Sequence, residues 1–149
     1  MVLEYTKVQS TLDVTVVGEK TMTGSAVTLA VVDLTSAKYF RSFECLALVV
    51  QNAALTGTLT ITASIATATN GTGTVEVVRT IVVPSTGTKA VLEIVPEILS
   101  HASDRSGTVV KSVIFKATGT NTDTLDCAII GTPNFAQDGL TASDHTSVA

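Results

Sequence analysis

The hydrophobic pattern of residues 43–51 marks this stretch as the centre of the predicted fold. From Cys45 to Val50 neither set of alternate positions is polar, so a strand here would bury side chains on both faces. Polar positions alternate with apolar ones only at its start, at Ser42 and Glu44. The pattern therefore predicts a central strand that is covered by a layer on each side.

Seven other segments are predicted to be strands, because their residues alternate or are rich in β-branched and apolar side chains. They cover residues 11–17, 27–33, 58–65, 74–81, 89–95, 108–117 and 124–130. The tripeptide Gly18-Glu19-Lys20 is expected to turn the chain after the first of them. Asn70-Gly71 predicts a hairpin between 58–65 and 74–81, because both residues tolerate the positive φ angles of a two-residue turn. Residues 119–123 are expected to join the last two strands as a second hairpin.

Eight short strands with turn signals between them are typical of a sandwich or barrel. We predict an all-β fold, an eight-stranded jelly-roll-like antiparallel β-sandwich, with an immunoglobulin-like sandwich as the alternative. The sandwich is expected to span residues 11–133, between an extended N-terminal arm at 1–10 and a C-terminal tail at 134–149.

Composition excludes several classes of function. Only 15% of the 149 residues are charged, the net charge is −4, and the basic residues are scattered, so no nucleic-acid-binding surface is expected. The absence of Trp argues against a stacking platform for bases or sugars. No apolar run is long enough to cross a membrane, and residues 1–7 do not resemble a signal peptide, so synthesis in the cytoplasm is expected.

The residues that could carry chemistry do not assemble into a recognisable site. His101 lies in a polar loop and His145 in the tail, where histidines are usually just solvated. Asp123 and Asp126 could hold a hard cation, but the oxygen-rich loop that calcium needs is missing, so a turn aspartate and an outward strand aspartate are expected. We predict a protein that is not an enzyme, with no catalytic residue, cofactor or metal site.

Two further motifs have structural interpretations. Gly71-x-Gly73 precedes a strand, not the helix N-terminus that would bind phosphate, so it is interpreted as a turn. Cys45 and Cys127 each lie in an apolar strand-like run and are expected to be buried reduced thiols. A disulfide between them requires adjacent strands, and the sequence leaves that open.

The two ends of the chain are the predicted binding segments. Extended termini around a charge-poor core are typical of a subunit that lays its arms across neighbouring subunits, where an arm can add to a sheet edge. The apolar residues that would anchor the arms are Val2, Leu3, Tyr5, Phe135 and Leu140.

Segment order gives a resemblance to a known class of proteins. The segments are Gly24–Leu34, the central strand, Leu59–Gly73, Leu92-Glu93-Ile94 and Val110–Phe115. In these the chain resembles small head proteins of tailed bacteriophages, the cement, decoration or auxiliary capsid proteins. Lys111 and Lys116 stand around Ile114-Phe115 where some of these proteins interleave Tyr and Arg.

The resemblance implies a structural virion protein on the capsid surface. Such proteins are generally dimers or trimers with a jelly-roll or related β-fold, and they clamp neighbouring subunits of the major capsid protein. The expected partners are thus the major capsid protein and further copies of this chain. The alternatives are a receptor- or carbohydrate-binding β-sandwich of a phage tail or fibre, and a tail-tube or connector subunit.

Overall fold

A computed structural model describes residues 13–33, 43–51, 55–95, 107 and 109–133. The described ranges contain eight strands and no helix: β1 Asp13–Thr21, β2 Val27–Asp33, β3 Phe43–Gln51, β4 Leu59–Ala66, β5 Thr74–Val83, β6 Lys89–Ile94, β7 Ser112–Thr118 and β8 Thr124–Pro133. The predicted arms at 1–10 and 134–149 lie outside the described residues. The all-β prediction is confirmed.

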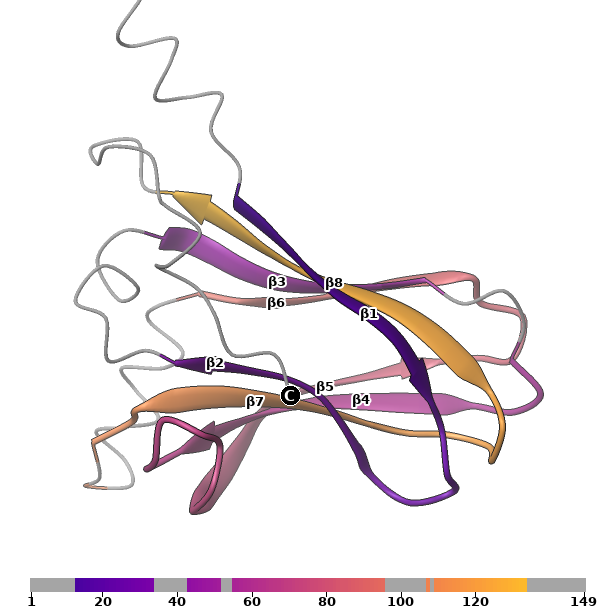
Figure 1. Cartoon of the computed structure of the whole chain (residues 1–149), viewed down its shortest axis with the longest axis horizontal. Helices are drawn as coiled ribbons and strands as arrows, with labels where there is room; N and C mark the ends of the chain where they lie inside the picture. Colours follow the sequence, from indigo (N-terminus) through magenta and orange to yellow (C-terminus); the bar gives the residue numbers. More distant parts are fainter. Residues whose placement is uncertain (1–12, 34–42, 52–54, 96–106, 108, 134–149) are drawn as a thin grey trace, which may run out of the picture.

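The strands form two sheets that pack face to face (Figure 1). One has the order β1-β8-β3-β6 and the other β2-β7-β4-β5, and every pairing is antiparallel. Consecutive strands belong to opposite sheets at most steps, and β4–β5 is the one pair that is adjacent both in sequence and in its sheet. This four-plus-four arrangement is that of a jelly roll, whereas an immunoglobulin constant-type domain divides its strands four and three.

The core fills the space between the sheets. Strands β3, β4, β6, β7 and β8 contribute alternate side chains to it, as a sheet with one buried face requires. Its largest fully buried members are Phe115, Met22, Leu29, Leu48, Leu59, Ile61, Ile65, Leu92, Ile94 and Leu125.

The predicted turn at Gly18-Glu19-Lys20 is wrong, because β1 continues to Thr21. Its register with β8 shifts between Val16 and Gly18, and Gly18 has a φ of 87°. A glycine with positive φ allows a strand to accommodate one extra residue as a bulge and still pair with its neighbour. Here the turn signal marks a bulge, after which β1 pairs with β8 for four more residues.

The hairpin of β4 and β5 is confirmed, but its connection is not a two-residue turn. Asn70 does not have a positive φ; among the described residues only Thr122 and five glycines, including Gly71 and Gly73, have one. The Asn70 side-chain oxygen accepts hydrogen bonds from the backbone N–H (3.1 Å) and hydroxyl (2.8 Å) of Thr72. This longer loop packs on the outside of its own sheet, since a Cβ added at Gly71 would lie 3.1 Å from Val31 and from Ile114.

The second predicted hairpin, at residues 119–123, is wrong. β7 pairs with β2 and β4, and β8 pairs with β1 and β3, so the segment between them crosses from one sheet to the other. Sequence proximity favours a hairpin, but the jelly-roll order places these two strands in different layers.

The central position of β3 is confirmed, and the prediction that both of its faces are covered is corrected. β3 lies between β8 and β6. Leu46, Leu48 and Val50 are buried against the other sheet, whereas Ala47 and Val49 are only half-buried on the opposite side. The second apolar face of this strand therefore forms part of the outer surface of the sandwich.

Candidate functional site

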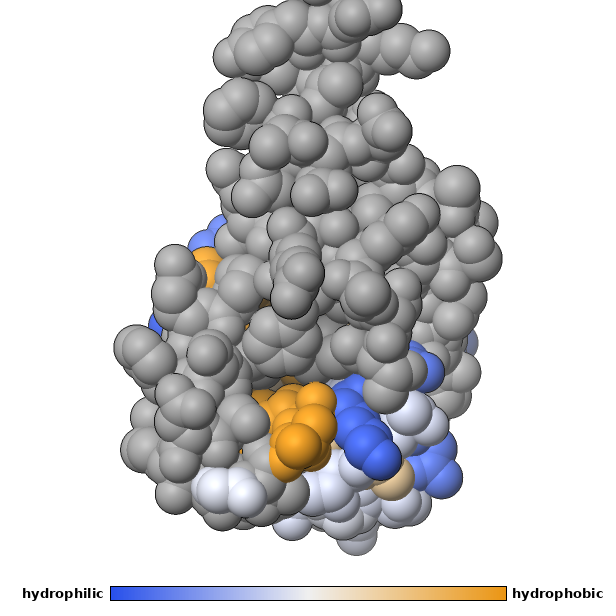
Figure 2. Space-filling model, turned by 90° about the vertical axis from the view of Figure 1, so that its left-hand side faces the viewer, coloured by the Kyte–Doolittle hydropathy of each residue, from blue (hydrophilic) through white to orange (hydrophobic). Residues whose placement is uncertain are grey.

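The two outer sheet faces of the sandwich are the candidate binding surfaces among the described residues. Within the described ranges, no group of three or more His, Cys, Asp or Glu side chains could hold a metal ion. No helix in that part of the chain is both long and apolar enough to span a membrane. Seen from the end that carries the β4–β5 loop, the described residues present hydrophobic and hydrophilic groups next to each other (Figure 2).

The outer face of the β2-β7-β4-β5 sheet is dominated by threonine. Cross-strand register places Thr28, Lys116, Thr62 and Thr80 in one row across all four strands. A second row holds Thr118, Thr60 and Val82. We call these seven residues the threonine face.

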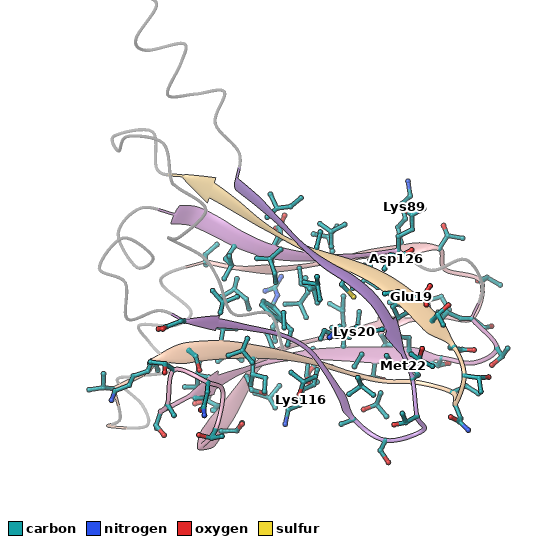
Figure 3. All side chains as sticks on the ribbon, viewed as in Figure 1. Glu19, Lys20, Met22, Lys89, Lys116 and Asp126 are labelled. Carbon is teal, nitrogen blue, oxygen red and sulfur yellow. The ribbon has the colours of Figure 1, made fainter. Side chains whose placement is uncertain are left out.

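The threonine face carries little charge and little flexibility. Lys116 is its one ionisable residue and points away from the opposite sheet (Figure 3). Its threonine and valine side chains are branched at Cβ, which restricts χ1 and lowers the entropy lost when they are fixed in a contact. Because the hydroxyl group can both donate and accept hydrogen bonds, such a surface can pair with polar groups of a partner.

The outer face of the β1-β8-β3-β6 sheet carries a block of apolar side chains at its centre. Val49 lies opposite Ala128 on β8 and Val91 on β6, and Ala47 lies opposite Ile130. Val91 is 51% exposed, and the other four are half-buried. We call these five residues the apolar outer face.

A polar row borders the apolar outer face at one end. Glu19 on β1 is opposite Asp126 on β8, Asp126 is opposite Gln51 on β3, and Gln51 is opposite Lys89 on β6. All four are exposed, and Lys89 points away from the other sheet (Figure 3). A shallow hollow opens between this row and the apolar outer face, where Gly18 contributes no side chain; its lining includes Val49, Gln51, Asp126 and Ala128.

Asp123 and Asp126, the two aspartates considered as a cation site, lie in different environments. Asp126 is exposed on the outside of β8, and Asp123 is buried, with 4% of its surface exposed. The Asp123 carboxylate accepts hydrogen bonds from the Thr56 hydroxyl (2.8 Å) and from the Thr56 backbone N–H (3.0 and 3.2 Å). Asp123 therefore fastens the segment before β4 to the β7–β8 connection, a structural role.

Cys127 is a buried free thiol, as predicted. Burial raises its pKa from 9.0 to about 11; the nearby charge of Lys20 lowers the pKa and that of Asp126 raises it, both by less. Cys45 pairs with Thr132 and Val50 pairs with Cys127 along the same ladder, so the two cysteines are five residues apart on neighbouring strands. That spacing, roughly 16 Å, is too long for a disulfide between them.

The thiol of Cys127 is expected to react slowly with iodoacetamide at pH 8 in the folded protein and rapidly in denaturant. The reactive species is the thiolate, whose fraction is small when the pKa is about 11. Because the folded pKa lies above the ordinary value, the contribution of this group to stability is complete below pH 9 and falls as the pH rises towards 11. Mass spectrometry of the peptide that contains Cys127 measures the rate, and equal rates with and without denaturant would contradict the prediction.

The predicted arm contacts are not described by the structure. Val2, Leu3, Tyr5, Phe135 and Leu140 all lie outside the described residues, as do His101, His145 and both tyrosines. Sequence reasoning missed the threonine face, although Thr58-x-Thr60-x-Thr62 already indicated an outward row of hydroxyls. It also missed the Asp123–Thr56 contact, which joins residues 67 positions apart and leaves no local signal.

Comparisons with known proteins give distant structural similarity. The sequence matches no protein-family model and no curated protein. Among solved structures, PirA is 14% identical, with 82% of this chain and 94% of that chain covered and a TM-score of 0.44. The Triatoma virus empty capsid is 10% identical, with coverage of 87% and 90% and a TM-score of 0.44. A family 11 carbohydrate-binding module of Clostridium thermocellum is 14% identical, with coverage of 83% and 82% and a TM-score of 0.43. Similarities of this size identify neither a family nor a function.

Proposed function

We propose that the chain is a structural virion protein, a cement or decoration subunit that binds and stabilises a shell of major capsid protein. In this proposal it acts at the capsid surface after synthesis in the host cytoplasm, and it performs no reaction. The threonine face and the terminal arms, 1–10 and 134–149, make the contacts.

The observation that carries the proposal is the threonine face. Charged residues are depleted from the centres of protein interfaces, since each would have to be desolvated. Two rows that cross the sheet hold a single ionisable side chain, Lys116, among five threonines and a valine. A stiff, hydroxyl-bearing surface of this kind can bind another protein with a small loss of conformational entropy.

The jelly-roll fold suits this role physically. Four of the eight described strands, β3, β4, β7 and β8, each hydrogen-bond to two others, and the two sheets pack on each other, so a partner meets a surface that is already ordered. A preorganised surface loses less entropy on binding than a mobile one, and the gain accumulates over many copies on a shell.

The proposal is tested by co-sedimentation with shells assembled from the major capsid protein. The variant Thr62→Glu/Thr80→Glu places two neighbouring carboxylates in the threonine face, and we expect it to lose at least tenfold in shell affinity. Thr86→Glu is the matched control, because Thr86 is exposed in the β5–β6 connection, outside both faces. Protection of the shell against heat should fall in parallel.

Deletions separate the two kinds of contact. Removal of residues 1–10 and 134–149 should weaken binding while the threonine face retains part of it. If both the deletion and Thr62→Glu/Thr80→Glu bind shells as the unaltered chain does, the proposal fails. If the unaltered chain does not bind, and a glycan screen gives specific ligands instead, the carbohydrate-binding alternative replaces it.

A further inference from the structure

The apolar outer face requires an explanation that the core does not supply. Antiparallel sheets with one solvated side normally alternate apolar residues inward with polar residues outward. On β8 and β3 the outward positions Ala128, Ile130, Ala47 and Val49 are all apolar. Val91 extends the block onto β6, where the exposed Glu93, opposite Ala47, ends it. Contiguous apolar surface of this kind marks an interaction site.

The charge of the polar row beside the apolar outer face changes from negative to positive across the sheet. Two carboxylates, Glu19 and Asp126, stand at the β1 side, and Lys89 stands at the β6 side. Within one molecule Glu19 and Lys89 are three strand spacings apart, about 14 Å, because β8 and β3 lie between their strands. The carboxylates instead oppose each other directly, a cross-strand arrangement of like charges that is unfavourable on its own.

We propose that the apolar outer face binds a second copy of this chain. The two copies are related by a two-fold axis that lies between their facing sheets. The axis is parallel to the strands and passes over the gap between β8 and β3. The β6 edge of one copy then lies over the β1 edge of the other. The polar rows of the two copies then face each other at the same level along the strands, with their strand order reversed. Lys89 of the second copy therefore faces Glu19 and Asp126 of the first. The apolar residues of the two copies meet beside these rows, and both like-charge pairs gain a cation.

The bulge in β1 makes room for this contact. Gly18 contributes no side chain to the hollow beside Asp126, and a Cβ added there would meet nothing within 4 Å. The long Lys89 side chain of the second copy can lie across this open position. The arrangement is isologous, since the same residues act from both sides, which is the commonest symmetry of protein dimers.

The size of the face predicts a weak dimer. Four strands about 4.8 Å apart and five residues of β8 span roughly 19 by 17 Å, which is well below the ~800 Å² that each partner of a stable complex usually buries. Dimerisation is therefore expected to depend on concentration and to be favoured on a crowded assembly. The inference does not depend on capsid binding, which is assigned to the opposite sheet and the arms.

Sedimentation velocity of the full chain over a concentration series tests the proposal. The unaltered protein should shift from monomer to dimer as the concentration rises. Val91→Glu should abolish the shift, because it places a carboxylate inside the apolar contact. Val77→Glu is the matched control: Val77 is an equally exposed valine, 52% against 51%, on β5 of the other sheet and outside the threonine face, and it should leave the dimer unchanged.

A charge exchange gives the second test. Lys89→Glu alone and Glu19→Lys alone should each weaken the dimer at least tenfold, and the double variant should recover most of the loss. At about 14 Å within one copy these side chains cannot compensate for each other, so recovery can arise only between copies. Higher salt should weaken the unaltered dimer and the recovered one.

The outcomes are distinct. A monomer at every concentration overturns the proposal, as does a dimer that Val91→Glu leaves intact or that the charge exchange does not restore. A monomer whose shell binding is lost in Val91→Glu would assign the face to the capsid protein instead of a second copy. If the unaltered chain dimerises but does not bind shells, only the proposed function is overturned.

Discussion

Replacement of Asp123 with alanine is expected to lower the free energy of unfolding by about 2 kcal/mol. The buried carboxylate accepts hydrogen bonds from the hydroxyl and the backbone N–H of Thr56, and hydrogen bonds to charged groups are stronger than neutral ones. Without the carboxylate, the segment that leads into β4 loses these hydrogen bonds to the β7–β8 connection. Urea denaturation followed by circular dichroism measures the change.

The control for this prediction lies three residues away. Asp126→Ala removes the same side chain from an exposed position opposite Glu19, so it should leave stability unchanged or slightly raised. Asp123→Asn should lie between the two, because an amide oxygen can still accept one of the bonds. If Asp123→Ala and Asp126→Ala have equal effects, the contact with Thr56 contributes nothing to stability.

Phe115→Ala should destabilise the protein further, by about 3–5 kcal/mol. Phe115 is the largest of the fully buried side chains, and its strand, β7, is a central strand of its sheet. Its loss removes apolar contacts and leaves a cavity between two sheets that cannot close over it. Since a domain of this kind is stable by only about 5–15 kcal/mol, the variant should melt far below the unaltered chain or fail to fold.

The exposed Val82 provides the comparison for Phe115. Val82→Ala also shortens an apolar strand residue, but at 62% exposure little contact is lost, so we expect less than about 1 kcal/mol. A thermal melt of both variants, with far-ultraviolet circular dichroism as the signal, distinguishes the two results. Similar melting temperatures would mean that the space between the sheets is not filled as described.

The strands could be predicted from the sequence because alternation of apolar and polar residues is a local property. Each of the eight predicted segments overlaps an observed strand, and the eight-stranded jelly-roll prediction is confirmed. Errors arose where glycine or a short loop was interpreted as a turn. Gly18 stands in a bulge, and residues 119–123 link two sheets, because pairing between distant strands decides what a local signal becomes.

The candidate surfaces were less accessible to sequence reasoning than the strands. The unbroken apolar run at Cys45–Val50 correctly marked two apolar faces, but it could not show that one of them lies on the outside of the sandwich. The threonine face depends on register among four strands, so Thr28, Thr62 and Thr80 form a row that no sequence spacing reveals. The Asp123–Thr56 contact is likewise created by the fold alone.

The pairing of the first strand with the last has a consequence for biosynthesis. β1 hydrogen-bonds to β8, and β3 is bound between β8 and β6, so the sheet they share cannot close until residues 124–133 have left the ribosome. Apart from the β4–β5 hairpin, every pairing joins segments far apart in the chain, a topology associated with slow folding. The nascent polypeptide must therefore keep an apolar stretch such as Cys45–Val50 from premature aggregation until β8 is available to pair with it.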